Sequence, residues 1–171
     1  MHSLNSLRDL LVDEVKDIYS AETQILRALP KMAVAASNPA LRSSLTDHLT
    51  RTEGHVERLD RVIAILGATS SGKVCHAMKG LVEEAGEAIK TRGPDPVRDA
   101  NLIGAAQRIE HYEIAAYGTA RAFAAQLGED EIASLLERTL AEEGEINNRL
   151  TAIATVINAD AQFVGSTGDT Q

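Results

Sequence analysis

The most informative part of this chain is Ile109-Glu110-His111-Tyr112-Glu113-Ile114-Ala115-Ala116-Tyr117. It lies inside a long helical pattern, in which residues at alternating spacings of three and four share one face. That face is small and apolar at both ends but carries Glu110 and Glu113 in its middle. Two carboxylates on a buried stripe repel each other and lose hydration unless a cation lies between them. The stretch therefore predicts a helix that contributes acidic ligands to a metal site.

The composition around this stretch favours one all-helical domain. The chain has 171 residues, is rich in Ala, Leu, Ile and Glu, and contains only 3% aromatic residues, a balance that favours helix over sheet. Its net charge of −8 argues against binding to nucleic acid or to anionic membranes. We therefore expect no nucleic-acid partner and no membrane partner.

Two further features bear on the compartment. No apolar stretch approaches the roughly 20 residues that a membrane span needs, and the N-terminal residues do not have the pattern of a secretory signal. The single cysteine, Cys75, excludes an intramolecular disulfide framework and fits a reducing environment. From these features we expect a cytoplasmic protein.

Four long segments show apolar residues at helical spacing. The first starts near Ser3 to Ser6, with Asp9 in its first turn and a kink expected at Pro30. The other three are predicted over residues 40–66, 96–126 and 130–158, with Pro39 at or near the first position of the second helix and Asp95 as the cap of the third. A shorter helix over residues 74–91 is expected in the crossover between the second and third long helices. Residues 1–160 are expected to form the bundle, and residues 161–171 a flexible tail.

Each long helix carries polar residues near its middle, where a core face is normally apolar. These residues are Glu22 on the first helix, His48 and His55 on the second, Glu110 and Glu113 on the third, and Glu143 on the fourth. In an antiparallel four-helix bundle, mid-helix positions share one layer. The sequence therefore predicts an all-α antiparallel bundle with these six side chains as metal ligands, and oxygen and nitrogen donors suit iron or manganese.

Several segments, in order along nearly the whole chain, resemble one known family. The chain is similar to the bacterial YciE/YciF stress-protein family, a ferritin-like group, and the Glu110-His111-Tyr112-Glu113 block is the most specific match. The resemblance implies a ferritin-like bundle with a dinuclear, carboxylate-bridged metal centre. Glu110-x-x-Glu113 also resembles the helix of rubrerythrins that supplies two carboxylates. The segments that carry the family resemblance are 19–22, 48–49, 57–59, 75–81, 109–118 and 139–143.

Three positions depart from the ferritin-like ligand pattern. Thr52 stands where a Glu-x-x-His motif ending at His55 would place its glutamate, and Ile146 stands where the motif starting at Glu143 would place its histidine. Arg51 occupies a position where relatives usually carry an acid. These departures predict a site that holds one metal tightly and a second weakly, or that binds only after rearrangement.

Two functions of different classes fit the sequence. The first is a ferritin-like stress-response protein whose dinuclear iron or manganese centre handles peroxide or dioxygen, with Glu113 and Glu143 as bridging ligands. The second is a non-enzymatic helical module that oligomerises or binds a partner and has lost part of its metal site. Whether the protein is an enzyme stays open between them. In both cases a homodimer is the expected assembly, and an iron-storage or DNA-protecting cage is disfavoured by the acidic charge.

Simpler roles for the same residues also remain open. Arg108 or Arg121 could neutralise Glu110 and Glu113, Glu143 could be an ordinary exposed acid, and His48 could support a ligand instead of being one. His55 could be a core histidine with an ordinary hydrogen-bond partner.

Overall fold

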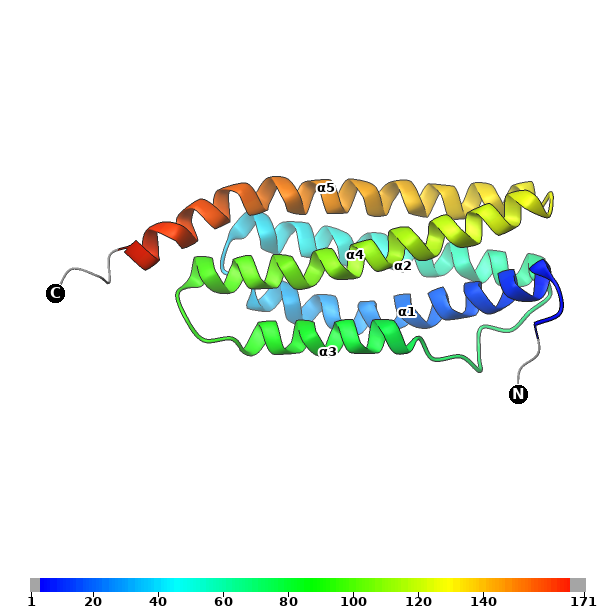
Figure 1. Cartoon of the computed structure of the whole chain (residues 1–171), viewed down its shortest axis with the longest axis horizontal. Coiled ribbons are helices and arrows are strands. Elements are labelled where there is room, and N and C mark those ends of the chain that lie inside the picture. Colours follow the sequence, from blue (N-terminus) through cyan, green and yellow to red (C-terminus); the bar gives the residue numbers. More distant parts are fainter. Residues whose placement is uncertain (1–3, 167–171) are drawn as a thin grey trace.

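The computed structural model describes residues 4–166, and side chains for residues 4–164 of these. Four long helices, α1 (Leu7–Ala35), α2 (Pro39–Leu66), α4 (Asp95–Gln126) and α5 (Asp130–Ser166), lie side by side along the long axis of the molecule (Figure 1). Each packs against two neighbours that run in the opposite direction, in the cyclic order α1, α2, α5, α4. This is the predicted antiparallel four-helix bundle.

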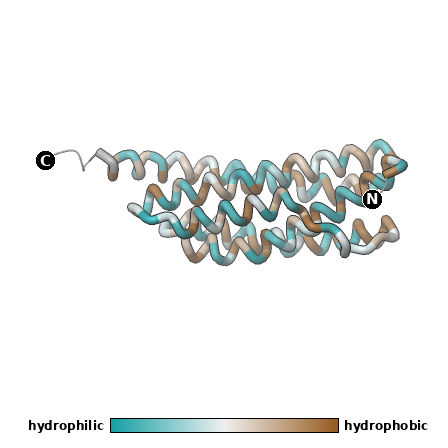
Figure 2. Tube along the Cα trace, turned by 60° about the horizontal axis from the view of Figure 1, so that its bottom comes forward, coloured by the Kyte–Doolittle hydropathy of each residue, from teal (hydrophilic) through white to brown (hydrophobic). Residues whose placement is uncertain are grey.

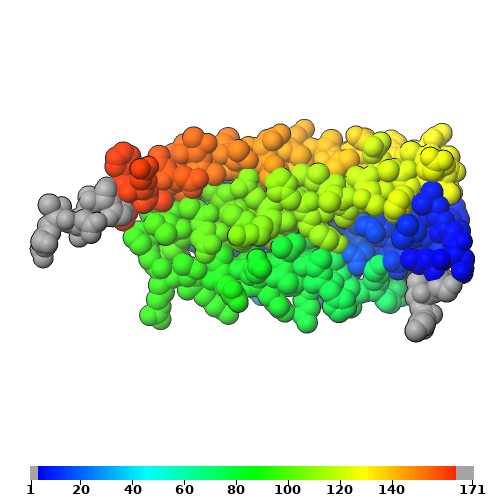
Figure 3. All heavy atoms as spheres, in the orientation of Figure 1, coloured from blue at the N-terminus to red at the C-terminus, as the bar shows by residue number. Residues whose placement is uncertain are grey.

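The fifth helix, α3 (His76–Lys90), is the predicted helix of the crossover. It packs along the outside of the bundle against α1 and α4, and Figure 3 shows α3 and α4 lying below α5 on the face in view. Because α3 and the connections on either side of it carry the chain back along the bundle, α4 can run parallel to α2 and antiparallel to both of its own neighbours (Figure 1). Among the described residues, no helix combines the length and apolar character that a membrane crossing requires.

Side-chain caps explain why the first two helices start where they do. The Ser6 hydroxyl accepts a hydrogen bond from the Asp9 amide at 3.0 Å, so Ser6 is the N-cap within the predicted Ser3 to Ser6 stretch. The Asn38 side chain accepts hydrogen bonds from the amides of Ala40 and Leu41 in the first turn of α2. Pro39 occupies the same turn, as predicted. In both cases the cap satisfies amides that have no partner within the helix.

Two predicted helix ends are corrected by the structure. Asp95 is the first residue of α4 and not its cap, because Pro94 holds the cap position without a side-chain hydrogen bond. The carboxylate of Asp95 instead accepts a bond from Arg98 at 2.9 Å. At the same end of the bundle, α5 continues past Asn158 to Ser166 (Figure 1), so part of the predicted tail is helical, and residues 167–171 lie outside the described residues.

The interior consists of two apolar clusters with a polar layer between them. One cluster surrounds Ile25, Leu45 and Leu150, and the other surrounds Ile18, Leu59 and Leu136. On each long helix the mid-helix polar residue lies between these clusters in sequence, and Figure 2 shows hydrophilic and hydrophobic residues alternating along the helices. The apolar ends therefore fix the helix positions, and the polar residues are buried in the middle as a consequence.

Candidate metal centre

The six predicted ligands converge in the polar layer, contributed by α1, α2, α4 and α5. All are at most 1% exposed: Glu22, His48, His55, Glu110, Glu113 and Glu143. Their donor atoms form two groups, one of His48, Glu110, Glu113 and Glu143, the other of Glu22, His55 and Glu143. Within each group the atoms lie within 4.8 Å of one another, and Glu143 belongs to both.

In the first group, His48 is surrounded by carboxyl groups but is itself neutral. Its Nδ1 lies 3.1 Å from Glu110 Oε1, and its Nε2 lies 3.7 Å from Glu143 Oε2. Burial lowers the pKa of His48 to about 4, against the opposing charge of Glu143. Burial and the charge of Glu143 also raise the pKa of Glu110 well above 4.5. The contact between His48 and Glu110 is therefore not an ion pair, and an imidazole nitrogen with a free lone pair is a metal donor.

In the second group, His55 is charged and ionises the shared glutamate. Its Nδ1 lies 2.8 Å from Glu143 Oε1 and 3.4 Å from Glu22 Oε1. Burial alone would lower the pKa of His55, but these carboxylates raise it to about 10. Burial likewise opposes ionisation of Glu143, yet its contacts with His55 lower its pKa. A proton on His55 Nδ1 thus occupies the place that a metal ion can take.

Most donor atoms of the layer lack a hydrogen-bond partner. Both carboxyl oxygens of Glu110, Glu113 and Glu143 and both ring nitrogens of His48 are buried without one. Buried polar atoms in this state destabilise a fold. Four carboxylates balance the charge of two divalent cations, so the residues present fit a pair of such ions.

The number of ligands of each type is also that of a complete dinuclear site. Bundles that hold two iron or manganese ions typically use a Glu from each of two helices and a Glu-x-x-His from each of the others, which makes four glutamates and two histidines. Here the same set is distributed differently: α2 supplies both histidines and α4 supplies two of the glutamates. His48 thus replaces the histidine that is missing at Ile146, and Glu110 replaces the glutamate that is missing at Thr52, so these two departures do not reduce the number of ligands.

Thr52 has a structural role in this arrangement. It is fully buried, and its hydroxyl donates to the backbone carbonyl of His48 at 3.0 Å. The hydroxyl therefore has its hydrogen-bond partner within α2 and needs none from the layer.

One partner of the layer was missed by sequence reasoning. Glu142 Oε2 lies 3.0 Å from His55 Nε2 and also accepts a hydrogen bond from Arg58. Burial opposes ionisation of Glu142, but the Arg58 contact lowers its pKa, so the carboxylate accepts and the Nε2–H of His55 donates. This pairing leaves Nδ1 as the atom of His55 that faces Glu22 and Glu143. The spacing within α2 gave no signal for this contact, because it joins two helices.

Two further side chains position the layer. The Tyr117 hydroxyl donates a hydrogen bond to Glu22 Oε1 at 2.5 Å. The centroid of its ring lies 6.4 Å from that of the His55 ring, in an edge-to-face arrangement. Glu22 Oε2 is left without a partner. On the outer side of α4, Tyr112 donates to Asp17 at 2.6 Å and lies 2.9 Å from the sulfur of Cys75, which joins α4 to α1 and to the start of α3.

The simpler roles considered for these acids find no support in the described contacts. Arg108 pairs with Glu84 and Arg121 with Glu137, so neither arginine neutralises Glu110 or Glu113. Glu143 is 0% exposed. Within the described part of the chain, the polar neighbours of these acids are therefore His48, His55, Tyr117 and the other acids of the layer, and not an arginine.

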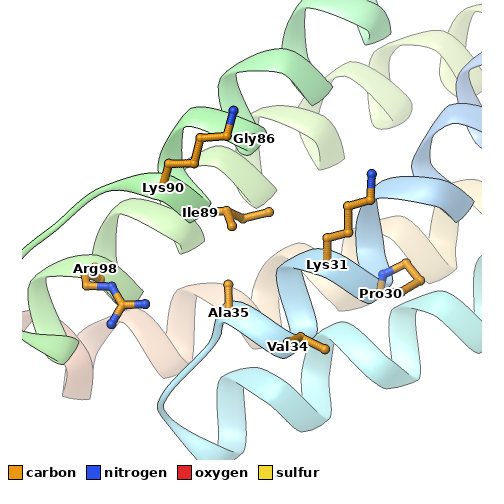
Figure 4. A pocket seen from close by; sticks show the side chains of 8 residues that line it. All are labelled: Pro30, Lys31, Val34, Ala35, Gly86, Ile89, Lys90 and Arg98. Carbon is orange, nitrogen blue, oxygen red and sulfur yellow. The ribbon is translucent and has the colours of Figure 1, made fainter.

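A surface hollow lies away from this layer. It has a volume of about 790 Å³ and is formed by Pro30, Val34 and Ile89, with Lys31, Lys90 and Arg98 around it (Figure 4). None of the six predicted ligands lines it. The candidate metal ligands are therefore in the buried layer and not in this hollow.

Comparison with known proteins agrees with this architecture. Residues 6–162 match the family described as "Domain of unknown function (DUF892)". Protein YciF of Escherichia coli strain K12 is 44% identical over 156 residues, which is 89% of this chain and 92% of YciF. The crystal structure of YciF, described as a stress protein, has a TM-score of 0.88 to this chain and covers 91% of it and 99% of the YciF chain.

Two other solved structures extend the comparison. A protein of Rhodopseudomonas palustris called YcfI, described as a putative structural protein, is 43% identical, with a TM-score of 0.84 over 88% of this chain and 96% of its own. A ferritin-like diiron-carboxylate protein of Bacillus anthracis has a TM-score of 0.69 over 88% of this chain and 99% of its own, at 17% identity, a likeness of fold alone. With a family match over residues 6–162 and a ferritin-like bundle, the chain belongs to the DUF892 family and is similar to the stress protein YciF over nearly all of its length.

Proposed function

We propose that this protein is a YciF-like stress protein that binds two iron or manganese ions in its bundle core and uses them to handle hydrogen peroxide or dioxygen. The observation that carries the proposal is the arrangement of buried, unpartnered donor atoms in two groups that share Glu143. Such a layer destabilises a protein that has no cation to place there. Four glutamates and two histidines provide the charge and the donors that two such ions require.

The residues of the layer divide into holding and positioning roles. Glu143 would bridge the two ions, because it belongs to both groups, while Glu113 and Glu110 would serve the ion beside His48. Glu22 and His55 would serve the other, with Tyr117 and Glu142 fixing their orientations. A bound pair of redox-active ions supplies electrons to a small oxidant. The chain's own part is to keep the site dry and to hold each donor atom in place.

Metal analysis of purified protein tests this proposal. Protein prepared without chelators and loaded anaerobically should contain two equivalents of iron or manganese per chain and should consume hydrogen peroxide. Glu143→Gln should lower both quantities sharply, because one substitution affects both groups. Glu137→Gln, which changes an exposed acid of the same helix that pairs with Arg121, is the matched control and should match the natural protein. Trace metal alone after loading would end the proposal.

A second candidate is a non-enzymatic helical module. The similarity to a protein described as putatively structural favours it. This candidate predicts metal binding without peroxide consumption, or no metal binding at all. The same loading experiment separates it from the first.

We further propose that the protein works in the cytoplasm as a homodimer. The single, buried Cys75 fits a reducing compartment, and small acidic bundles commonly pair through the flat face of two helices. Light scattering coupled to gel filtration should give twice the chain mass, and a monomer mass at micromolar concentration would contradict the dimer.

A further inference from the structure

A small polar cleft lies between α2 and α5, next to His48. Its volume is about 20 Å³, and roughly 10–15 Å³ is enough to hold one water molecule. Ser44 and His48 line it from α2, and Ile146 lines it from α5. The cleft is therefore the size of one small polar molecule and touches one of the candidate ligands.

The side chains from α2 that line the cleft offer unused donor atoms. Ser44 is only 3% exposed and its hydroxyl has no hydrogen-bond partner. His48 is 1% exposed, and neither of its ring nitrogens has one. Two neighbouring buried groups in this state indicate a place where a small polar species is accommodated, because unpartnered buried polar atoms are otherwise rare.

Two ion pairs bridge the rim of the cleft from α2 to α5. Arg51 Nη1 lies 2.9 Å from Glu145 Oε2, and Arg149 Nη1 lies 2.6 Å from Asp47 Oδ2. All four side chains are between 39% and 68% exposed. Exposed ion pairs contribute little in water, so these contacts can open and close easily, and an opened pair leaves a free carboxylate at the mouth.

Two of the three residues that depart from the ferritin-like ligand pattern also line the cleft. Arg51 supplies half of one rim pair. Ile146, at the position of an expected histidine, gives the α5 side an apolar wall without a donor. Arg51 and Ile146 therefore give this opening a charged rim and one apolar wall.

We propose that this cleft is the passage through which a divalent metal ion reaches the buried layer, with the pairs Arg51–Glu145 and Asp47–Arg149 as its gate. The inference rests on the proposed metal centre. When a pair opens, Asp47 or Glu145 attracts the cation at the mouth. The Ser44 hydroxyl and then His48 replace its waters on the way to Glu110 and Glu143, which lie 3.1 Å and 3.7 Å from the His48 ring nitrogens.

Stopped-flow mixing of metal-free protein with Co²⁺, followed by visible absorption, measures the rate of uptake. Arg51→Met opens the gate while keeping the Glu145 carboxylate, and uptake should become about two- to fivefold faster, the range that the strength of an exposed ion pair allows. The matched control is Arg61→Met. It removes the same charge from another pair between α2 and α5, Arg61–Glu131, which does not line the cleft, and its rate should stay that of the natural protein.

A second variant closes the passage. Ser44→Leu fills the cleft and should slow uptake more than tenfold, while the amount of Co²⁺ bound at equilibrium stays unchanged. Circular dichroism checks that this variant folds, and if it does not fold, the comparison of Arg51→Met with Arg61→Met decides alone.

The outcomes separate the passage from the metal centre itself. Equal rates for Arg51→Met and Arg61→Met, in a protein that binds Co²⁺ at equilibrium, would overturn the passage and leave the metal centre standing. Absence of bound Co²⁺ in the natural protein at equilibrium would overturn both.

Discussion

Glu113 illustrates how the buried layer opposes the stability of the metal-free protein. It is 1% exposed, and neither of its carboxyl oxygens has a hydrogen-bond partner. Burial, followed by the charges of Glu143 and Glu22, raises its pKa well above 4.5. The side chain is thus held in the core by the packing around it and not by any favourable contact of its own.

Replacing this side chain should therefore stabilise the metal-free protein. Glu113→Met removes a buried unpartnered group and keeps a similar volume, so we expect a gain of about 1–3 kcal/mol. For a chain of this size, each kcal/mol corresponds to roughly 2–4 °C in Tm. Calorimetry in the presence of chelator measures the shift, and excess metal should stabilise the variant less than the natural protein. A lower Tm for the metal-free variant would contradict this account of Glu113.

Glu142 should matter for metal affinity although it is not among the candidate ligands. Its carboxylate orients His55 through the 3.0 Å contact to Nε2, and loss of such a partner typically weakens metal binding by about 10- to 100-fold. We expect this loss for Glu142→Ala and a smaller one for Glu142→Gln, which keeps an acceptor oxygen. Competition with a chelating dye measures the affinities, and an unchanged affinity for Glu142→Ala would remove Glu142 from the site.

At the scale of single helices, most of the fold could be predicted from the sequence because its stop and start signals are local. Ser6 and Pro39 mark helix starts that the structure reproduces. The end of α5 was predicted too early. The helix continues past Asn158 because the sequence there contains no proline and no glycine before Gly165 to stop it. The kink expected at Pro30 stays a prediction, since α1 continues as helix through it.

The candidate site was predictable only in part, for a related reason. The stripe of each helix identified Glu22, Glu110, Glu113 and Glu143, because burial follows from spacing along one helix. The pairing of His55 with Glu142 depends on how α2 and α5 are aligned and rotated against each other, which the spacing within one helix does not contain. For the same reason, the sequence did not reveal that His48 supplies the histidine that is missing at Ile146.

A buried aspartate ties together three of the long helices. Asp99 of α4 is 2% exposed and accepts hydrogen bonds from the amides of Ser37 and Asn38, at 2.9 Å and 2.7 Å, in the turn between α1 and α2. Hydrogen bonds to charged groups contribute about 1.5–3 kcal/mol each. We therefore expect Asp99→Ala to lower Tm by roughly 5 °C or more. Thermal melts should show almost no change for Asp95→Ala, an exposed acid on the same helix that contacts Arg98, and equal melts for the two variants would refute the role of Asp99.

For the whole molecule, the layer makes the stability of the metal-free protein depend on pH. Burial raises the pKa values of Glu110 and Glu113, and the contacts with Glu143 and Glu22 raise that of His55 to about 10. A group whose pKa is higher in the folded protein contributes stability below its unfolded pKa and loses it as the pH rises through the folded value. His48 has the opposite sign, with its pKa lowered to about 4, but its contribution is complete above 6.5.

Above pH 6.5, the contributions of Glu110, Glu113 and His55 therefore all lower the stability of the metal-free protein as the pH rises. We expect the Tm of the chelator-treated protein to fall as the pH is raised from 6.5 to 9. Bound metal replaces the protons of the layer, so metal affinity should rise over the same interval. Calorimetry at several pH values measures both effects, and a metal-free Tm that rises with pH in this interval would contradict the assigned protonation states.

The proposed metal centre requires ligands from four helices to meet around two cations in one dry layer. Anomalous X-ray scattering at the iron and manganese absorption edges, from crystals of protein loaded with each metal, tests this most directly. We expect two peaks per chain, one beside His48 and one beside His55, about 3.5–4 Å apart, with Glu143 in contact with both. A layer without peaks after loading, or peaks confined to the protein surface, would contradict it.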